Sequence, residues 1–153
     1  MSIIESKSQL IEYFIQGIKK ENQLRIGVEH EKFLFSGKEK KRANYKQIKK
    51  IFKNLEIFGW KAVYEKEKVV GLKRGEQQIT TEPGLQYELS GAPLKNIHLV
   101  CSESSTHFKE IKLATKDLDI STNSIGFDPF NNLDEVPQNP KERYKIMTKE
   151  MQK

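Results

Sequence analysis

The chain has 153 residues, enough for one domain with a sizeable core, and its 31% charged and 36% hydrophobic residues exclude a disordered protein. No apolar run approaches the roughly 20 residues that cross a bilayer, and residues 1–7 lack the layout of a signal peptide, so we expect a cytoplasmic protein without membrane contact. The net charge of +6 falls in lysine-rich segments such as 38–53, where a helix turns lysines to solvent, so we expect no nucleic-acid partner.

The N-terminal part predicts a helix followed by a strand. Apolar residues recur at helical spacing over 8–20, which favours an amphipathic helix that packs on the rest of the domain. Alternation then predicts a strand over 24–35. Glu29 and Glu31 lie two residues apart and therefore point to the same face, about 7 Å from each other. His30 points to the opposite face, and we interpret it as structural.

The middle of the chain predicts a second helix and an antiparallel meander. Helical spacing returns over 45–58, and Gly59 can end that helix in a left-handed conformation. Short strands separated by tight turns follow, at residues 60–64, 69–73, 79–82 and 85–90. Because strands joined by tight turns pair with their neighbours, the expected fold class is α+β, with an antiparallel sheet backed by helices.

The C-terminal third predicts one long helix and a shorter one. Residues 93–118 carry the long apolar stripe, which includes Cys101. As the only cysteine, Cys101 excludes an internal disulfide and a multi-cysteine zinc site, and we expect a buried, reduced thiol. A strand over 120–127, a loop over 128–140 and a helix from residue 141 complete the expected elements.

Four glutamates are candidate metal ligands on the predicted sheet: Glu29, Glu31, Glu82 and Glu88. Mg²⁺ prefers oxygen ligands and is usually held by a few carboxylates together with nucleotide phosphates. An alternating strand with glutamates on its wet face gives the same pattern, so the residues alone leave both interpretations open. No catalytic triad and no glycine-rich phosphate loop is visible, so catalytic and nucleotide-binding residues stay unassigned.

Three segments together resemble a known enzyme family. They are Gly27-Val28-Glu29-His30-Glu31-Lys32-Phe33, the span from Gly71 to Gly84, and Tyr87-Glu88-Leu89-Ser90-Gly91-Ala92-Pro93-Leu94. In order and spacing they resemble glutamate-cysteine ligase of the plant and alphaproteobacterial type. The resemblance continues through the long helix to Arg143-Tyr144-Lys145-Ile146-Met147 and covers about residues 24–151.

This resemblance implies a glutamine-synthetase-like carboxylate-amine ligase fold, of which residues 1–153 are the N-terminal part of a single catalytic domain. It implies an ATP-dependent ligase that joins the γ-carboxylate of L-glutamate to the amine of L-cysteine through γ-glutamyl phosphate, the first step of glutathione synthesis. It also implies Mg²⁺ as cofactor, held by Glu29, Glu31, Glu82 and Glu88. Most contacts to ATP and glutamate would lie in the missing remainder, so we expect this chain alone to be inactive.

The chain departs from the family pattern at several positions. Leu85 stands where a second glycine is usual, 130–132 where a tryptophan-containing segment is usual, Glu142 in place of a glycine and Gln152 in place of a proline. The resemblance also implies that Cys101 matches a cysteine that pairs with one further along in the family. Two other functions stay open: a related carboxylate-amine ligase, and a non-catalytic remnant or basic binding module.

Overall fold

The computed structural model describes residues 3–151. The helices are α1 (Lys7–Gln16), α2 (Tyr45–Leu55), α3 (Ile97–Thr115) and α4 (Glu142–Met151), with 3-10 turns at Glu21–Gln23, Glu56–Phe58 and Leu133–Glu135. The strands are β1 (Glu29–Ser36), β2 (Lys41–Arg42), β3 (Lys61–Glu65), β4 (Lys68–Arg74), β5 (Gln77–Thr81), β6 (Tyr87–Ser90) and β7 (Ile120–Asn123). No helix among these residues is long and apolar enough to cross a membrane.

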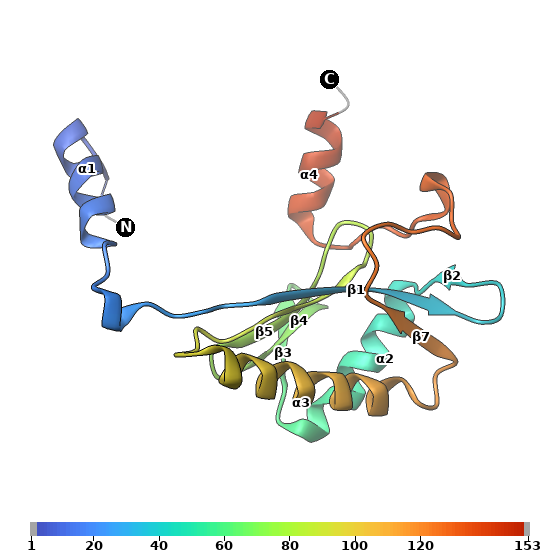
Figure 1. The fold of residues 1–153 in the computed structure, drawn as a ribbon. Coiled ribbons are helices and arrows are strands. Elements are labelled where there is room, and N and C mark those ends of the chain that lie inside the picture. Colours follow the sequence, from blue (N-terminus) through green and yellow to red (C-terminus); the bar gives the residue numbers. More distant parts are fainter. Residues whose placement is uncertain (1–2, 152–153) are drawn as a thin grey trace.

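The strands form one antiparallel sheet in the order β2-β1-β6-β5-β4-β3, with β7 also paired to β1. Figure 1 shows α2 and α3 against one face of this sheet, while α1 and α4 stand on the other side. The predicted α+β class and the meander from β3 to β6 are confirmed. Helices α2 and α3 therefore cover one face of the sheet and leave the opposite face open.

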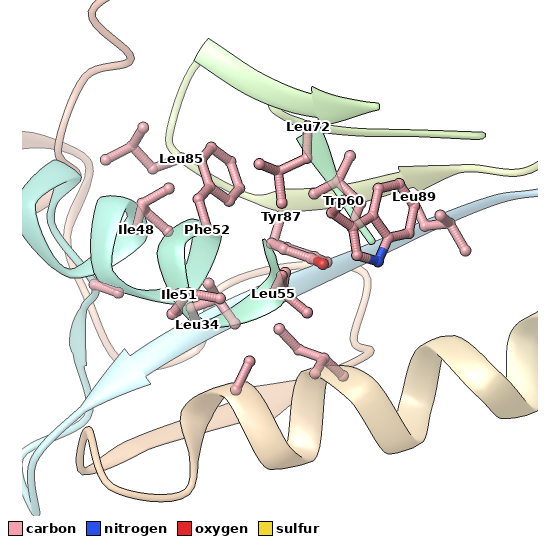
Figure 2. Packing of buried hydrophobic residues seen from close by; sticks show 14 residues of the cluster. Leu34, Ile48, Ile51, Phe52, Leu55, Trp60, Leu72, Leu85, Tyr87 and Leu89 are labelled. Carbon is pink, nitrogen blue, oxygen red and sulfur yellow. The ribbon is translucent and has the colours of Figure 1, made fainter. Parts of the chain in front are cut away.

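The core lies between the sheet and α2 and α3. Tyr87 and Leu89 of β6 are fully buried on this side, since alternate residues of a strand point to the same face. Tyr87 lies among apolar side chains of α2, as Figure 2 shows, and Leu89 belongs to the same buried cluster. The α2 contribution is Ile48, Ile51, Phe52 and Leu55. Burying this apolar surface supplies the main stabilising free energy of the fold.

Helix α2 has clear start and stop signals. Asn44 accepts a hydrogen bond from the Gln47 amide, and the Gln47 side chain accepts one from the Asn44 amide, which is a capping box. At the other end Gly59 has φ 87°, the left-handed conformation predicted for it. The prediction of this helix from its spacing is thus confirmed to within a few residues.

The buried side of α3 differs from the predicted apolar stripe. Its buried residues include Val100, His107 and Glu110, whereas Cys101 is exposed, so the expectation of a buried thiol is wrong. The physical reason is that long-range polar contacts decide which side is buried. Glu110 accepts hydrogen bonds from the Trp60 indole at 2.9 Å and from Arg74 at 2.7 Å.

Other differences lie at the ends of the chain. The predicted packing of α1 is wrong for this chain, because none of its residues is buried. The strand expected from residue 24 begins at Glu29, since Ile26 forms only an isolated bridge with Leu94, which lies after the end of β6. β7 stops at Asn123 instead of continuing to residue 127.

Candidate functional site

The strand register gathers the predicted glutamates on the open face of the sheet. Glu88 of β6 lies directly opposite Glu31 of β1, and on its other side opposite Thr80 of β5. Glu29 lies two residues from Glu31 and pairs with Ser90. Because directly opposed residues of an antiparallel pair point to one face, the carboxylates of Glu31 and Glu88 project from the same surface.

Glu88 is the centre of this arrangement. Its side chain is buried, and its carboxylate accepts hydrogen bonds from the Thr80 hydroxyl at 3.2 Å and the Ser90 hydroxyl at 3.0 Å. Both donors come from the same face, from β5 and from β6 itself. Such donors stabilise an ionised carboxylate and fix its direction, which is what a ligand to a cation requires.

Glu82 joins the cluster from the turn after β5. Its amide donates to the Gln86 carbonyl at 2.9 Å, which closes the turn between β5 and β6. Burial raises the pKa of Glu82, and a hydrogen bond with Glu88 and the charges of Glu88 and Glu31 raise it further. Three of the four predicted ligands therefore interact electrostatically, and a cation among them would relieve their repulsion.

The glutamates do not form a finished metal site. Among residues 3–151, no three His, Cys, Asp or Glu side chains are grouped so that they could hold a metal ion. Glu29 and Glu31 are exposed, and among residues 3–151 no side-chain hydrogen bond fixes their carboxylates, unlike that of Glu88. All-oxygen donors on one face suit Mg²⁺ chemically. The assignment of the four glutamates as ligands stays a prediction.

Two basic residues beside the cluster were not predicted. Lys141 is buried and donates to the Thr81 carbonyl at 3.2 Å, and Arg143 donates to the Tyr144 hydroxyl. Burial lowers the pKa of Lys141 and the charge of Arg143 lowers it further, while Glu82 opposes these effects. Cationic side chains beside the carboxylates can bind anionic groups of a ligand that the carboxylates hold through a metal.

Asn139 explains how a distant segment reaches this site. Its side-chain amide donates to the carbonyl of Thr81 at 2.6 Å and to that of Glu82 at 3.1 Å, and its backbone amide donates to the Pro83 carbonyl at 2.8 Å. The loop before α4 is thereby fastened to the end of β5. The sequence predicted a loop over 128–140 from its Pro, Asn and Asp content, but no local pattern reveals the partner of Asn139.

A cleft of about 500 Å³ lies next to the glutamates on the same face. It takes in Phe33, two residues from Glu31, and Gln86, two residues from Glu88. Arg42 lies 4.6 Å above the Phe33 ring, bonds the Gly84 carbonyl, and pairs with Asp128 at 3.4 Å. The remaining lining is mostly apolar and comes from residues 83–84, 133–138 and α4. Its size and mixed lining are typical of a small-molecule site.

The opposite face, behind the glutamates, carries a buried ammonium group. Lys32 pairs with Tyr87, directly behind the pair of Glu31 and Glu88. Its ammonium lies 4.6 Å above the Phe108 ring and has no hydrogen-bond partner among the described residues. His30 bonds Ser104 at 2.8 Å, which agrees with its interpretation as structural.

Comparison with known proteins shows that nearly the whole chain is similar to several longer proteins. Over 149 residues the chain is 40% identical to the chloroplastic glutamate-cysteine ligase of Medicago truncatula and 41% identical to the chloroplastic glutamate-cysteine ligase A of Oryza sativa subsp. japonica. The corresponding Arabidopsis thaliana protein is 40% identical over 149 residues. Each match covers 97% of this chain but only 28 to 30% of the relative. The chain therefore spans less than a third of the length of these relatives.

These relatives overturn one expectation. A cytoplasmic location was expected, but all three relatives are named chloroplastic, so that expectation is wrong. The physical reason is that lacking a membrane span or a secretory signal pattern does not separate the cytoplasm from the interior of a plastid.

The family itself follows from a match over most of the chain. The model of glutamate-cysteine ligase family 2 (GCS2) matches residues 25–153, a stretch that contains every strand and all four candidate glutamates. The antiparallel sheet backed by helices is consistent with the carboxylate-amine ligase fold expected for this family. The chain belongs to glutamate-cysteine ligase family 2.

Proposed function

We propose that this chain supplies the carboxylate face of an active site that ligates the γ-carboxylate of L-glutamate to the amine of L-cysteine with ATP. The observation that carries the proposal is the cluster of Glu31, Glu82 and Glu88 on an open sheet face, flanked by Lys141 and Arg143. The membership of the chain in glutamate-cysteine ligase family 2 supports the choice of substrates.

The chemistry consists of two substitutions. The γ-carboxylate oxygen of glutamate attacks the terminal phosphorus of ATP, so that γ-glutamyl phosphate and ADP form. The cysteine amine then attacks the γ-carbonyl carbon, and phosphate leaves as the amine loses a proton. Both steps bring anions together, and Mg²⁺ would supply charge neutralisation and alignment of the reacting oxygens.

The residues of this chain have separate tasks in the proposal. Glu88, fixed by two hydroxyl donors, and Glu82, whose pKa is raised chiefly by burial and then by Glu88, would hold the cation together with Glu31 and Glu29. Lys141 and Arg143 would bind anionic oxygens of a substrate, since each is placed beside the carboxylates. These roles share one physical basis: the cation held by the glutamates and the two basic side chains would neutralise the negative charge of the substrates.

The proposal assigns this chain only part of the site. The matched relatives are more than three times as long as the matched stretch, so further ligands and substrate contacts would come from the rest of the domain. We therefore expect no ligation by the chain alone. The names of the relatives also make the chloroplast the expected location of the complete enzyme.

The test is ADP release in the presence of Mg²⁺ and glutamate, with and without cysteine, by the chain extended to the length of its relatives. Turnover should require both the metal and cysteine. Replacing Glu88→Gln should lower kcat by about a hundredfold or more, because the neutral amide is a poor ligand for Mg²⁺. Glu76→Gln, an exposed residue of the turn between β4 and β5, is the control and should leave kcat unchanged.

Two results would contradict the proposal. Unchanged turnover and Mg²⁺ dependence in Glu88→Gln would remove the carboxylate cluster from the site. No Mg-ATP binding by the extended chain, together with a steeply salt-dependent affinity for RNA, would favour a basic binding module instead.

A further inference from the structure

Helix α1 is well formed but covers nothing. Ser6 accepts a hydrogen bond from the Gln9 amide at 3.2 Å, and the Gln9 side chain caps the Ser6 amide in return. None of its ten residues is buried. Its apolar side chains and the adjacent Ile18 are between 45 and 76% exposed: Leu10, Ile11, Tyr13, Phe14, Ile15 and Ile18.

Such a helix is not expected to persist alone in water. Isolated helices shorter than about 12 residues are marginal even with favourable sequences, and most helical stability in proteins comes from packing an apolar face. Leu10, Phe14 and residues three or four positions from them share one side of α1. An apolar side of this kind indicates a protein surface that covers it.

Helix α1 lies on the same side of the sheet as the glutamates, so a protein surface that covers α1 would also lie on that side. Figure 1 shows α1 and α4 on the same side of the sheet, opposite α2 and α3. Helix α4 also exposes apolar side chains, with Ile146 at 64% and Met151 at 80%. Two partly apolar helices therefore flank the face that carries Glu31 and Glu88.

The comparisons with known proteins indicate which protein segment would cover α1 and α4. The match to relatives extends over 97% of this chain, α1 included, but over only 29% of the Medicago truncatula protein. We propose that the apolar sides of α1 and α4 bind the remaining part of a family 2 ligase domain and seat it over the glutamates. The inference rests on family membership and not on the proposed catalytic activity.

Two other occupants fit less well. A membrane-bound amphipathic helix carries lysine or arginine on its polar side, whereas that side of α1 holds Ser8, Glu12 and Gln16. A second copy of this chain could cover α1, but it would supply the same four glutamates again and no further part of the domain.

The test is co-expression of tagged chain with the part of the Medicago truncatula ligase that follows the matched stretch. We expect the two polypeptides to purify as an equimolar complex. Amide hydrogen exchange in α1 should then be at least about tenfold slower than in the chain alone, because packing suppresses local opening.

A matched pair of variants locates the contact on α1. Phe14→Lys places a charge in the apolar side and should weaken the complex by about tenfold or more, as truncating a central apolar anchor does. Gln16→Lys places the same charge on the opposite side, which faces Ile3 and Ile4 of the chain itself across a shallow cleft, and should leave affinity unchanged. Met151→Lys tests α4 in the same way.

Clear results would overturn the inference. The first is failure of the two polypeptides to co-purify, and the second is a complex in which the α1 amides exchange as fast as in the chain alone. The third is equal affinity of Phe14→Lys and Gln16→Lys for the remaining part of the ligase. The fourth is a dimer of the chain alone that Phe14→Lys disrupts. A complex that protects α1 but releases no ADP would leave this inference standing and count against the proposed function.

Discussion

The two faces of the sheet differ in what covers them. One face packs Tyr87 and Leu89 against α2 and α3, and its apolar side chains are fully buried. The other face presents Glu88 and Ser90, which alternate with those two residues along the same four-residue strand. A single short strand therefore holds part of the core and part of the candidate site.

This difference shows how the core positions the glutamates. Burial of Tyr87 and Leu89 fixes the register of β6, since a slip of one residue would turn its apolar side chains to the open face. That register places Glu88 opposite Glu31. The stability of the covered face and the geometry of the open face are thus two results of the same pairing.

The largest expected effect separates the two faces by stability. Phe52→Ala removes a buried ring from the middle of α2 and should lower the free energy of unfolding by about 3 to 5 kcal/mol, because the lost burial adds to the cost of a cavity. Glu31→Ala on the open face should change it by no more than about 0.5 kcal/mol. Urea unfolding of the full chain measures both, and equal losses would mean that the two faces are not divided in this way.

The sequence predicted the strands and the site face because both depend on local periodicity. Alternation places Glu29 and Glu31 on one side of β1 and Glu88 on one side of β6, whatever lies far away in the chain. The pairing of β1 with β6, which sets Glu31 opposite Glu88, joins segments far apart in the sequence and did not follow from the tight turns of the meander. Glu82 was expected at the end of the strand over 79–82, but it follows β5, and its position depends on the turn at 82–86.

The sequence failed where distant polar contacts decide burial. In α3 the apolar pattern favoured the side with Cys101, but the buried side includes His107 and Glu110. Glu110 is buried because Trp60 and Arg74, from other elements, donate hydrogen bonds to it. Charged residues are rarely placed in a core by pattern analysis, since their burial depends on partners that a local window does not contain.

Lys141 and Arg143 were missed for a related reason. They reach the glutamates because Asn139 fastens its loop to the end of β5, a contact across 58 residues of sequence. The departures from the family pattern are partly explained by the structure. Leu85 adopts φ 58°, where glycine is favoured, but its side chain is buried in the core and offsets that strain. Glu142 begins α4, where a carboxylate is favourable, and Gln152 lies outside the described residues.

A second prediction tests the covered face through pH. Burial, and to a smaller extent the charges of Lys32, His30 and Arg74, together lower the pKa of His107 to about 3. In the unfolded chain this pKa returns to about 6.5, so the unfolded state binds the extra proton first as pH falls. The contribution of neutral His107 is complete above pH 6.5 and is lost at up to about 1.4 kcal/mol per pH unit between 6.5 and 3.

His107→Phe isolates this effect. Both ring nitrogens lack a hydrogen-bond partner among the described residues, and the ring stacks on Tyr87 at 5.6 Å, so phenylalanine keeps the packing and removes only the titration. The variant should lose less stability than the parent between pH 6.5 and 4 in urea unfolding series. Parallel curves for the two proteins would show that His107 is not held neutral by burial.

The smallest expected effect has the opposite sign and belongs to the open face. Burial raises the pKa of Glu82, and its hydrogen bond with Glu88 and the charges of Glu88 and Glu31 add to this, so ionising Glu82 costs stability. Since the folded state then holds its proton more tightly than the unfolded state, stability falls as pH rises from the unfolded value through the raised one. Glu82→Gln should therefore stabilise the metal-free chain at neutral pH by up to about 1 kcal/mol, the scale of one like-charge pair on a sheet.

The same substitution should act in reverse once Mg²⁺ is added. A cation that binds the folded state raises its stability by mass action, and it binds more weakly to an amide than to a carboxylate. Thermal unfolding with and without Mg²⁺ measures both effects on one pair of proteins, with Ca²⁺-free buffer and Glu76→Gln as the control. A residue that destabilises the empty fold and stabilises the metal-bound one has the signature of a ligand, whereas a solvent-exposed glutamate would show neither change.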